Sequence, residues 1–143
     1  MPPFLILHAI DSDLEARLIC DKLNFAGFIA NTYEDVFGHT SRQDILEARY
    51  ELIDEAPAVI ILASQFLFGN DALVAFALIA QQQHKIIPII YRHEVELPAW
   101  FVNPILLNWD EDAGSQGWNK LSEALLLKVG HLFWQFPELP KPN

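Results

Sequence analysis

Two carboxylates follow the first apolar run of the chain, where a strand would deliver them to one edge of a sheet. Asp11 and Asp13 come after the run Phe-Leu-Ile-Leu-His at residues 4–8. An acidic pair there, joined by a third carboxylate after another strand, could accept a phosphoryl group. The clearest other strand, residues 58–63, is followed by Ser64 and brings no carboxylate. The sequence therefore excludes the phosphoryl-acceptor chemistry of response-regulator receivers.

Other residue types that carry chemistry lack the spacing that would bring them together. No glycine-rich phosphate loop occurs, and the residues after the first run offer no Ser/Thr/Gly cradle for a flavin phosphate. The histidines have no metal-ligand spacing; they are His8, His39, His84, His93 and His131. The single cysteine, Cys20, lies in an amphipathic segment and is interpreted as a core residue. We therefore expect no metal and no prosthetic group.

The composition and the net charge of the chain exclude some classes of binding partner. The chain has 143 residues, of which 52% are hydrophobic, enough for one domain with a substantial core. Nine Lys and Arg against 19 Asp and Glu give a net charge of −10. Nucleic acid and anionic membranes are therefore poor partners. The N-terminus has no cationic signal-peptide region, and no apolar stretch approaches the roughly 20 residues of a membrane span. We expect a cytoplasmic protein.

Short apolar runs alternate with amphipathic segments, and the runs predict strands buried on both faces. The runs lie at residues 4–8, 28–31, 58–63, 86–91 and 105–109. Helices are expected to start near Ser12, near Ser41 and at Asn70-Asp71, and a last one to cover residues 118–129. At the first of these starts, Ser12 and Glu15 form a capping box.

This order predicts an α/β fold of the flavodoxin-like, doubly wound kind. Five parallel strands would follow the order 2-1-3-4-5, with helices on both faces of the sheet. Residues 1–130 would form the domain, and residues 131–143 a C-terminal tail or a linker to a further module. In such a fold, ligands bind outside the carboxyl ends of the strands. The loops at 8–13, 33–41 and 64–72 are thus the candidate site.

In these loops the sequence resembles the TIR (Toll/interleukin receptor) domain family, from about Pro3 to Val129. The opening strand and loop match at residues 5–13, with Asp13 in the place of the motif's acidic residue. Further matches are the Ala-Gly-Phe turn within 25–29, the BB loop at 34–41, Ile-Ile-Pro-Ile-Ile at 86–90, Glu-Leu-Pro at 96–98 and Gly-Trp-Asn-Lys-Leu at 117–121. Pro88 matches the family's internal proline, which supports a strand there despite the proline.

The resemblance implies either NAD+ cleavage or signalling by self-assembly. Enzymatic TIR domains, such as bacterial ones in immune and antiviral defence, break the nicotinamide–ribose bond, and a Glu on helix C stabilises the developing positive charge. In this chain Ala77 occupies the position of that Glu, so the chain as written should be inactive. The implied pocket for NAD+, a substrate rather than a prosthetic group, comprises His8, Ala9, Ile10, Phe37, Gly38, Thr40, Ser41 and Leu73.

Several alternatives remain open at this point. Ala77 could be natural, or it could replace a Glu that was removed deliberately. The chain could instead be a non-enzymatic adaptor that associates with other TIR domains through the loop at 34–41, with a fused or associated sensor module. A doubly wound domain of unrelated function is the third possibility.

Overall fold

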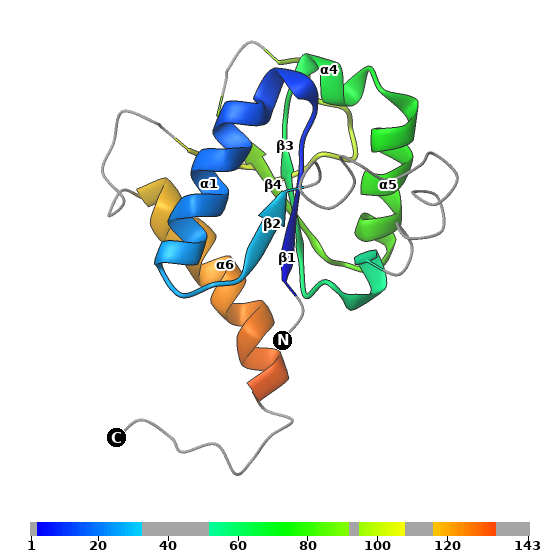
Figure 1. Cartoon of the computed structure of the whole chain (residues 1–143). Coiled ribbons are helices and arrows are strands. Elements are labelled where there is room, and N and C mark those ends of the chain that lie inside the picture. The colour runs from blue at the N-terminus through cyan, green and yellow to red at the C-terminus, as the bar shows by residue number, and fades with distance from the viewer. Residues whose placement is uncertain (1–2, 33–51, 92–94, 108–115, 134–143) are drawn as a thin grey trace.

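Five parallel strands form one sheet in the order β2-β1-β3-β4-β5 (Figure 1). The computed structural model describes residues 3–32, 52–91, 95–107 and 116–133. The strands are β1 (Phe4–Leu7), β2 (Ala30–Thr32), β3 (Val59–Leu62), β4 (Ile86–Ile90) and β5 (Ile105–Leu106). Pairs such as Leu5 with Val59 and Ile89 with Ile105 set the register. The predicted strand order and fold class are confirmed.

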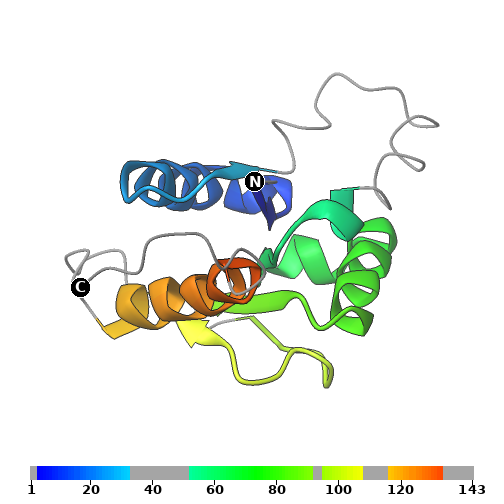
Figure 2. The same cartoon turned by 90° about the horizontal axis from the view of Figure 1, so that it is seen from below.

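Helices cover both faces of this sheet (Figure 2). A 3-10 turn, η1 (Ile10–Ser12), leads into α1 (Asp13–Phe25), which shares one face with α6 (Gln116–Phe133). The opposite face carries α4 (Gln65–Phe68) and α5 (Asp71–Gln82). Residues 52–55 are also helical. Among the described residues, no helix combines the length and hydropathy that crossing a bilayer requires.

Alternation along β1 divides the core into two apolar clusters. Phe4 and Ile6 point into the α1–α6 cluster, whose helix residues include Ile19 and Leu121. Leu5 and Leu7 point into the α5 cluster on the other face. The α5 cluster also contains Ala9, Ile53, Ala56, Val59, Ile61, Ala63, Leu67, Leu73, Phe76, Ala77, Ala80 and Phe101. Strands β1 and β3 are therefore buried on both sides, as their unbroken apolar runs predict, whereas β4 and β5 keep half-buried or exposed residues.

Pro88 lies in β4, which has a neighbouring strand on each side. The amide of Val59 donates to the carbonyl of Lys85 at 2.8 Å, and that of Ala63 donates to Ile89 at 2.9 Å. Alternate residues of β4 therefore bond to β3, and the nitrogen of Pro88 is directed to the other side. There β5 pairs only from Ile89 onward. The missing N–H thus removes no hydrogen bond of the ladder, which explains how the strand tolerates proline.

Several predicted boundaries and one predicted cap differ from the structure. The strands are shorter than their apolar runs, and the four-residue helix α4 was not predicted. Ser12 makes no side-chain cap, so the predicted capping box is wrong: its hydroxyl pairs with the Tyr91 hydroxyl instead. The last helix continues to Phe133 and includes the first three residues of the predicted tail. The rest of the tail and most of the predicted helix near Ser41 lie outside the described residues.

Candidate functional site

The candidate site lies at the carboxyl ends of β1 and β3, beside the start of α5. His8 follows β1 directly, and its side chain is almost completely buried. Its Nδ1 lies 3.0 Å from the carbonyl oxygen of Ala9 and 3.2 Å from Oδ1 of Asp13. Both oxygens are acceptors, so Nδ1 carries a proton that is directed to them, and Nε2 is the ring nitrogen that remains for another group. This buried Nε2 has no hydrogen-bond partner among the described residues.

Asp11 connects this loop to α4. Its Oδ2 accepts a hydrogen bond of 3.4 Å from the backbone N–H of Phe66, while its Oδ1 is buried and has no partner among the described residues. Beyond β3, the buried Ser64 caps α4 by accepting from the N–H of Leu67 at 3.1 Å. The carboxyl edge therefore holds two buried polar atoms, Nε2 of His8 and Oδ1 of Asp11, that could face a polar ligand.

The two predicted site residues on α5 lie inside the protein. Asn70 caps this helix, because its Oδ1 accepts from the N–H of Leu73 at 3.1 Å. Leu73 is 6% exposed and Ala77 is 0% exposed, and both belong to the α5 cluster together with Ala9. The structure thus brings Ala9, Leu73 and Ala77 into one apolar cluster. At position 77 the helix presents a methyl group to that cluster, with no atom that could take part in proton transfer or stabilise charge.

The remaining predicted site residues separate into two groups. Ile10 lies in η1 with 78% of its surface exposed, outside the apolar cluster that contains Ala9. The BB-loop residues Phe37, Gly38, Thr40 and Ser41 lie outside the described residues, so their part in a pocket stays a prediction. No three His, Cys, Asp or Glu side chains in the described parts of the chain form a group that could hold a metal ion.

The pairing of Ser12 with Tyr91 is a feature of this edge that the sequence reasoning missed. The two hydroxyls are hydrogen-bonded and buried, and they connect the start of α1 to the residue after β4. The residues lie 79 positions apart in the chain. The only signal was topological: β1 and β4 both flank β3, so their carboxyl ends lie near each other.

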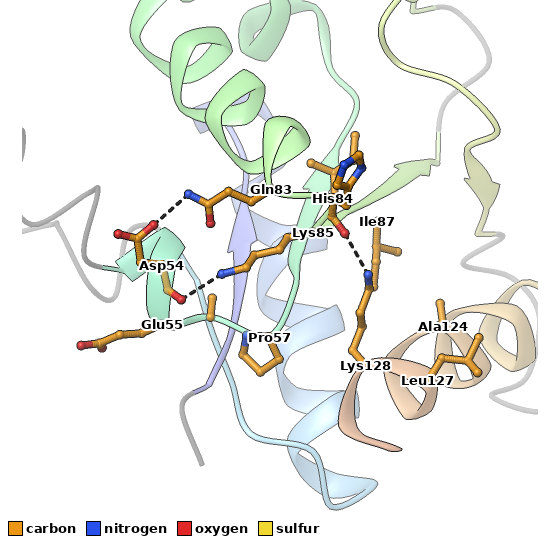
Figure 3. A pocket seen from close by; sticks show the side chains of 12 residues that line it. Asp54, Glu55, Pro57, Gln83, His84, Lys85, Ile87, Ala124, Leu127 and Lys128 are labelled. Carbon is orange, nitrogen blue, oxygen red and sulfur yellow. Dashed lines mark hydrogen bonds between the residues drawn. The ribbon is translucent and has the colours of Figure 1, made fainter. Parts of the chain in front are cut away.

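A groove of about 600 Å³ lies at the opposite, amino-terminal edge of the sheet (Figure 3). Its walls come from residues 54–57 and 83–87 and, on α6, from Ala124, Leu127 and Lys128. Nζ of Lys85 donates to the carbonyls of Ile53 and Asp54 at 2.8 and 2.9 Å, and Nζ of Lys128 donates to that of His84 at 2.9 Å. Burial lowers the pKa of Lys85, and the negative charge of the nearby Asp54 partly offsets this shift. These ammonium groups serve to hold loops and α6 together.

Comparison with known proteins finds similarity in structure only. No protein-family model matches the sequence, and no curated protein matches it. The TIR domain of the Toll-related receptor TRR-2 from the lower metazoan Hydra magnipapillata superposes with a TM-score of 0.68 at 23% identity, over 85% of this chain and 97% of that one. A metazoan TIR-STING receptor from C. gigas gives a TM-score of 0.55 at 18% identity, over 71% of this chain and 36% of that one. The chain therefore has the fold of TIR domains.

Proposed function

We propose that this chain is a TIR signalling domain that acts by associating with other TIR domains and does not itself cleave NAD+. The fold of the solved TIR structures supports the first part. The second part rests on one observation: Ala77 occupies the position of the family's catalytic Glu and is 0% exposed within an apolar cluster. Breaking the nicotinamide–ribose bond requires a carboxylate beside the ribose, and alanine supplies none.

No other carboxylate of α5 can take over this role. Asp71 is the only acidic residue of the helix, six positions before Ala77 and therefore about 240° around the helix axis. It is exposed at the first turn, where a negative charge stabilises the helix dipole. The helix that carries the catalytic group in enzymatic members thus serves only packing in this chain.

A second candidate is an NAD+-cleaving effector of immune defence in which Ala77, natural or introduced, replaces the Glu. The observation that favours it is the pair of buried polar atoms at the carboxyl edge, Nε2 of His8 and Oδ1 of Asp11. Together with the loop at 34–41, these atoms would contact a nucleotide. In the adaptor function that we favour, the same loop would instead contact a neighbouring TIR domain, and a fused or associated sensor module would trigger assembly in the cytoplasm.

One experiment separates the two candidates. NAD+ consumption is measured for the chain as given, for Ala77→Glu and for the control Ala75→Glu, which places the same carboxylate at an exposed position of α5. All three are assayed at high protein concentration with a crowding agent. We expect no consumption by any of them. If only Ala77→Glu consumed NAD+, the second candidate would be favoured, with Ala77 as a replacement of the catalytic Glu. If the chain as given consumed NAD+, the proposal would be refuted.

A further inference from the structure

The groove at the amino-terminal edge of the sheet has a largely apolar lining. Half of the residues that form it are apolar: Ala56, Pro57, Ile86, Ile87, Ala124 and Leu127. Leu127 is 75% exposed, although it belongs to a helix that covers the sheet. A volume of about 600 Å³ lies within the range of pockets that hold ligands. The groove is therefore large enough to take several side chains of a further segment.

Two ammonium groups lie at this groove, on different walls. Lys85 directly precedes β4, and Lys128 lies on α6 (Figure 3). Nζ of Lys85 donates to two main-chain carbonyls and Nζ of Lys128 to one, so within the described residues each keeps a donor for a further acceptor. Burial lowers the pKa of Lys85 and the charge of Lys128 lowers it further, while Asp54 offsets part of both effects. The two cations therefore act on each other, and a carboxylate between them would be stabilised by both.

Two acidic residues also line the groove, and neither takes this place. Oδ1 of Asp54 accepts a hydrogen bond of 2.8 Å from Nε2 of Gln83. Figure 3 shows the carboxylate of Glu55 directed away from both lysines. The space between Lys85 and Lys128 therefore suits one additional carboxylate with apolar groups beside it.

The end of α6 brings the residues that follow it to this groove. The helix continues to Phe133, five residues and about 7.5 Å past Lys128, and Figure 1 shows its end beyond the amino-terminal edge of the sheet. Residues 134–143, which we call the tail segment, lie outside the described residues and have the sequence Trp-Gln-Phe-Pro-Glu-Leu-Pro-Lys-Pro-Asn. Ten residues can span about 33 Å, so the tail segment is long enough to return to the groove.

The pattern of the tail segment matches the groove. Pro137 and Pro140 oppose a continued helix and favour the extended polyproline II conformation. That conformation has about three residues per turn, so Phe136 and Leu139 would share one face and Glu138 would project beside them. Proline-rich segments bind apolar grooves in this conformation at a low cost in conformational entropy. The tail segment thus offers two apolar side chains and one carboxylate, the groups that suit the groove.

We propose that the tail segment folds back into the amino-terminal groove, with Phe136 and Leu139 against its apolar wall and Glu138 between Lys85 and Lys128. This inference goes beyond the proposed function and does not depend on it. The groove and the candidate site lie at opposite edges of the sheet, so a docked tail segment would not compete for the edge at which TIR domains would associate. A module joined to the docked segment would be held beside the domain.

The charges favour this tethered segment over a separate anionic ligand. The chain has a net charge of −10, which repels a free anion. The tail segment contains one Glu and one Lys, so its own net charge is zero and this repulsion does not act on it as a whole. Because it is attached to α6, it is also present at a millimolar effective concentration. A weak contact is therefore enough to hold it in the groove.

The first test attaches a spin label to the variant Asn143→Cys of the 143-residue chain and records the methyl NMR signals of the labelled protein. Cys20 is 4% exposed and therefore stays unlabelled. Docking should broaden the signals of Ile86 and Leu127 in the groove and leave that of Ile10, at the carboxyl edge, unchanged. No selective broadening in the groove would overturn the inference and leave the groove to a separate partner.

A matched pair of variants separates docking from mere proximity to the end of α6. Phe136→Ser/Leu139→Ser removes the two apolar contacts without changing the charge, and Gln135→Ser is the control in the same segment. We expect the ratio of docked to undocked tail segment to fall at least about tenfold in the first variant, because burial of even one such side chain is worth that factor. The control should leave the ratio unchanged. Broadening that persists in the first variant would overturn the inference.

Mixing distinguishes docking within one chain from docking between chains. A spin-labelled chain without isotopes is added to an isotope-enriched chain without a label. We expect the groove signals of the enriched chain to stay sharp. If they broaden, the tail segment enters the groove of a second copy, and the inference is wrong.

A charge exchange tests the position of Glu138. Glu138→Lys and Lys128→Glu should each lower the docked ratio about fivefold, and the double exchange should restore it, because opposite charges then face each other again. Lys120→Glu makes the same change at an exposed position of α6 and should have no effect. Melting curves verify that the variants fold. If the double exchange docked no better than the single ones, the carboxylate would not lie beside Lys128, and the proposed arrangement would be refuted while the proposed function would stand.

Discussion

Helices α1 and α5 cover opposite faces of the same sheet, yet they differ in how many large apolar residues they leave exposed. The buried residues of α5 are Leu73, Phe76, Ala77 and Ala80, whereas α1 buries one stripe and exposes another, up to 95% at Phe25. In α5 the position at which enzymatic TIR domains carry a carboxylate has become part of the packing. In α1 large apolar side chains remain exposed. The contrast accords with the proposed function, association without NAD+ cleavage.

The two helices also begin differently. Asn70 caps α5 with its own side chain, which accepts from the N–H of Leu73. Ser12 stands at the same place before α1, but its hydroxyl pairs with Tyr91. The start of α5 is therefore stabilised locally, and the start of α1 is fixed by a contact with the far end of β4. Substitutions at these positions separate local from tertiary stabilisation.

The largest effect is expected for Ala77→Glu, because it places a carboxyl group in a fully buried apolar cluster. We expect the free energy of unfolding to fall by about 3–5 kcal/mol at neutral pH, as for other uncompensated buried charges. Burial favours the protonated form, so the loss should be smallest near pH 4 and grow as the pH rises above the usual glutamate pKa of about 4.3.

Urea unfolding between pH 4 and pH 8 measures this loss, and Ala75→Glu is the matched control at an exposed position. The control should change the stability by no more than about 0.5 kcal/mol. If Ala77→Glu proved as stable as the control, position 77 would accommodate a carboxylate. The contrast between the helices would then lose its main support, and the NAD+-cleaving function would be favoured over the adaptor function.

A smaller effect is expected at the pairing of Ser12 with Tyr91. Ser12→Ala and Tyr91→Phe should each lower the free energy of unfolding by about 1–3 kcal/mol, because each breaks a buried hydrogen bond. The double variant should lose less than the sum of the two, since the second change removes a group that has already lost this bond. Urea unfolding of the four proteins measures this coupling. Strictly additive losses would show that the two hydroxyls do not act together.

The sequence predicts the parts of this structure that rest on local signals. Residues 58–63 indicate a buried strand because their apolar run is unbroken, and Asn70-Asp71 predicts a cap that the structure contains. The strand at 86–91 could be predicted despite Pro88 only because the family has a proline at this place. Helix α4 escaped prediction because four residues are too few to show helical periodicity. At Ser12 the local signal gave the wrong partner, since a residue 79 positions away competes for the hydroxyl.

The candidate site could be predicted only in part, because the sequence shows residue types but not their burial or orientation. The sequence shows that position 77 has no carboxylate, but only the fold shows that this position is fully buried. The sequence also places His8 after a strand, but it does not reveal that Nδ1 points to Ala9 and Asp13 while Nε2 has no partner among the described residues. Side-chain orientation depends on contacts between distant segments, which periodicity does not encode. The exposure of Leu14 and Phe25 is likewise a property of the assembled fold.

The smallest of these effects is expected at Asn70, and it sharpens the comparison of the two helix starts. Asn70→Ala removes the cap of α5 and should lower the free energy of unfolding by about 1 kcal/mol, whereas Asn70→Gly should cost only a few tenths. Asn70→Asp keeps an acceptor at the cap and adds a negative charge beside the helix dipole, so it should cost nothing. Urea unfolding of the three variants gives the ranking. If Asn70→Ala had no effect, packing of Leu73 and Phe76 alone would hold the start of α5, and both helices would depend on tertiary contacts in the same way.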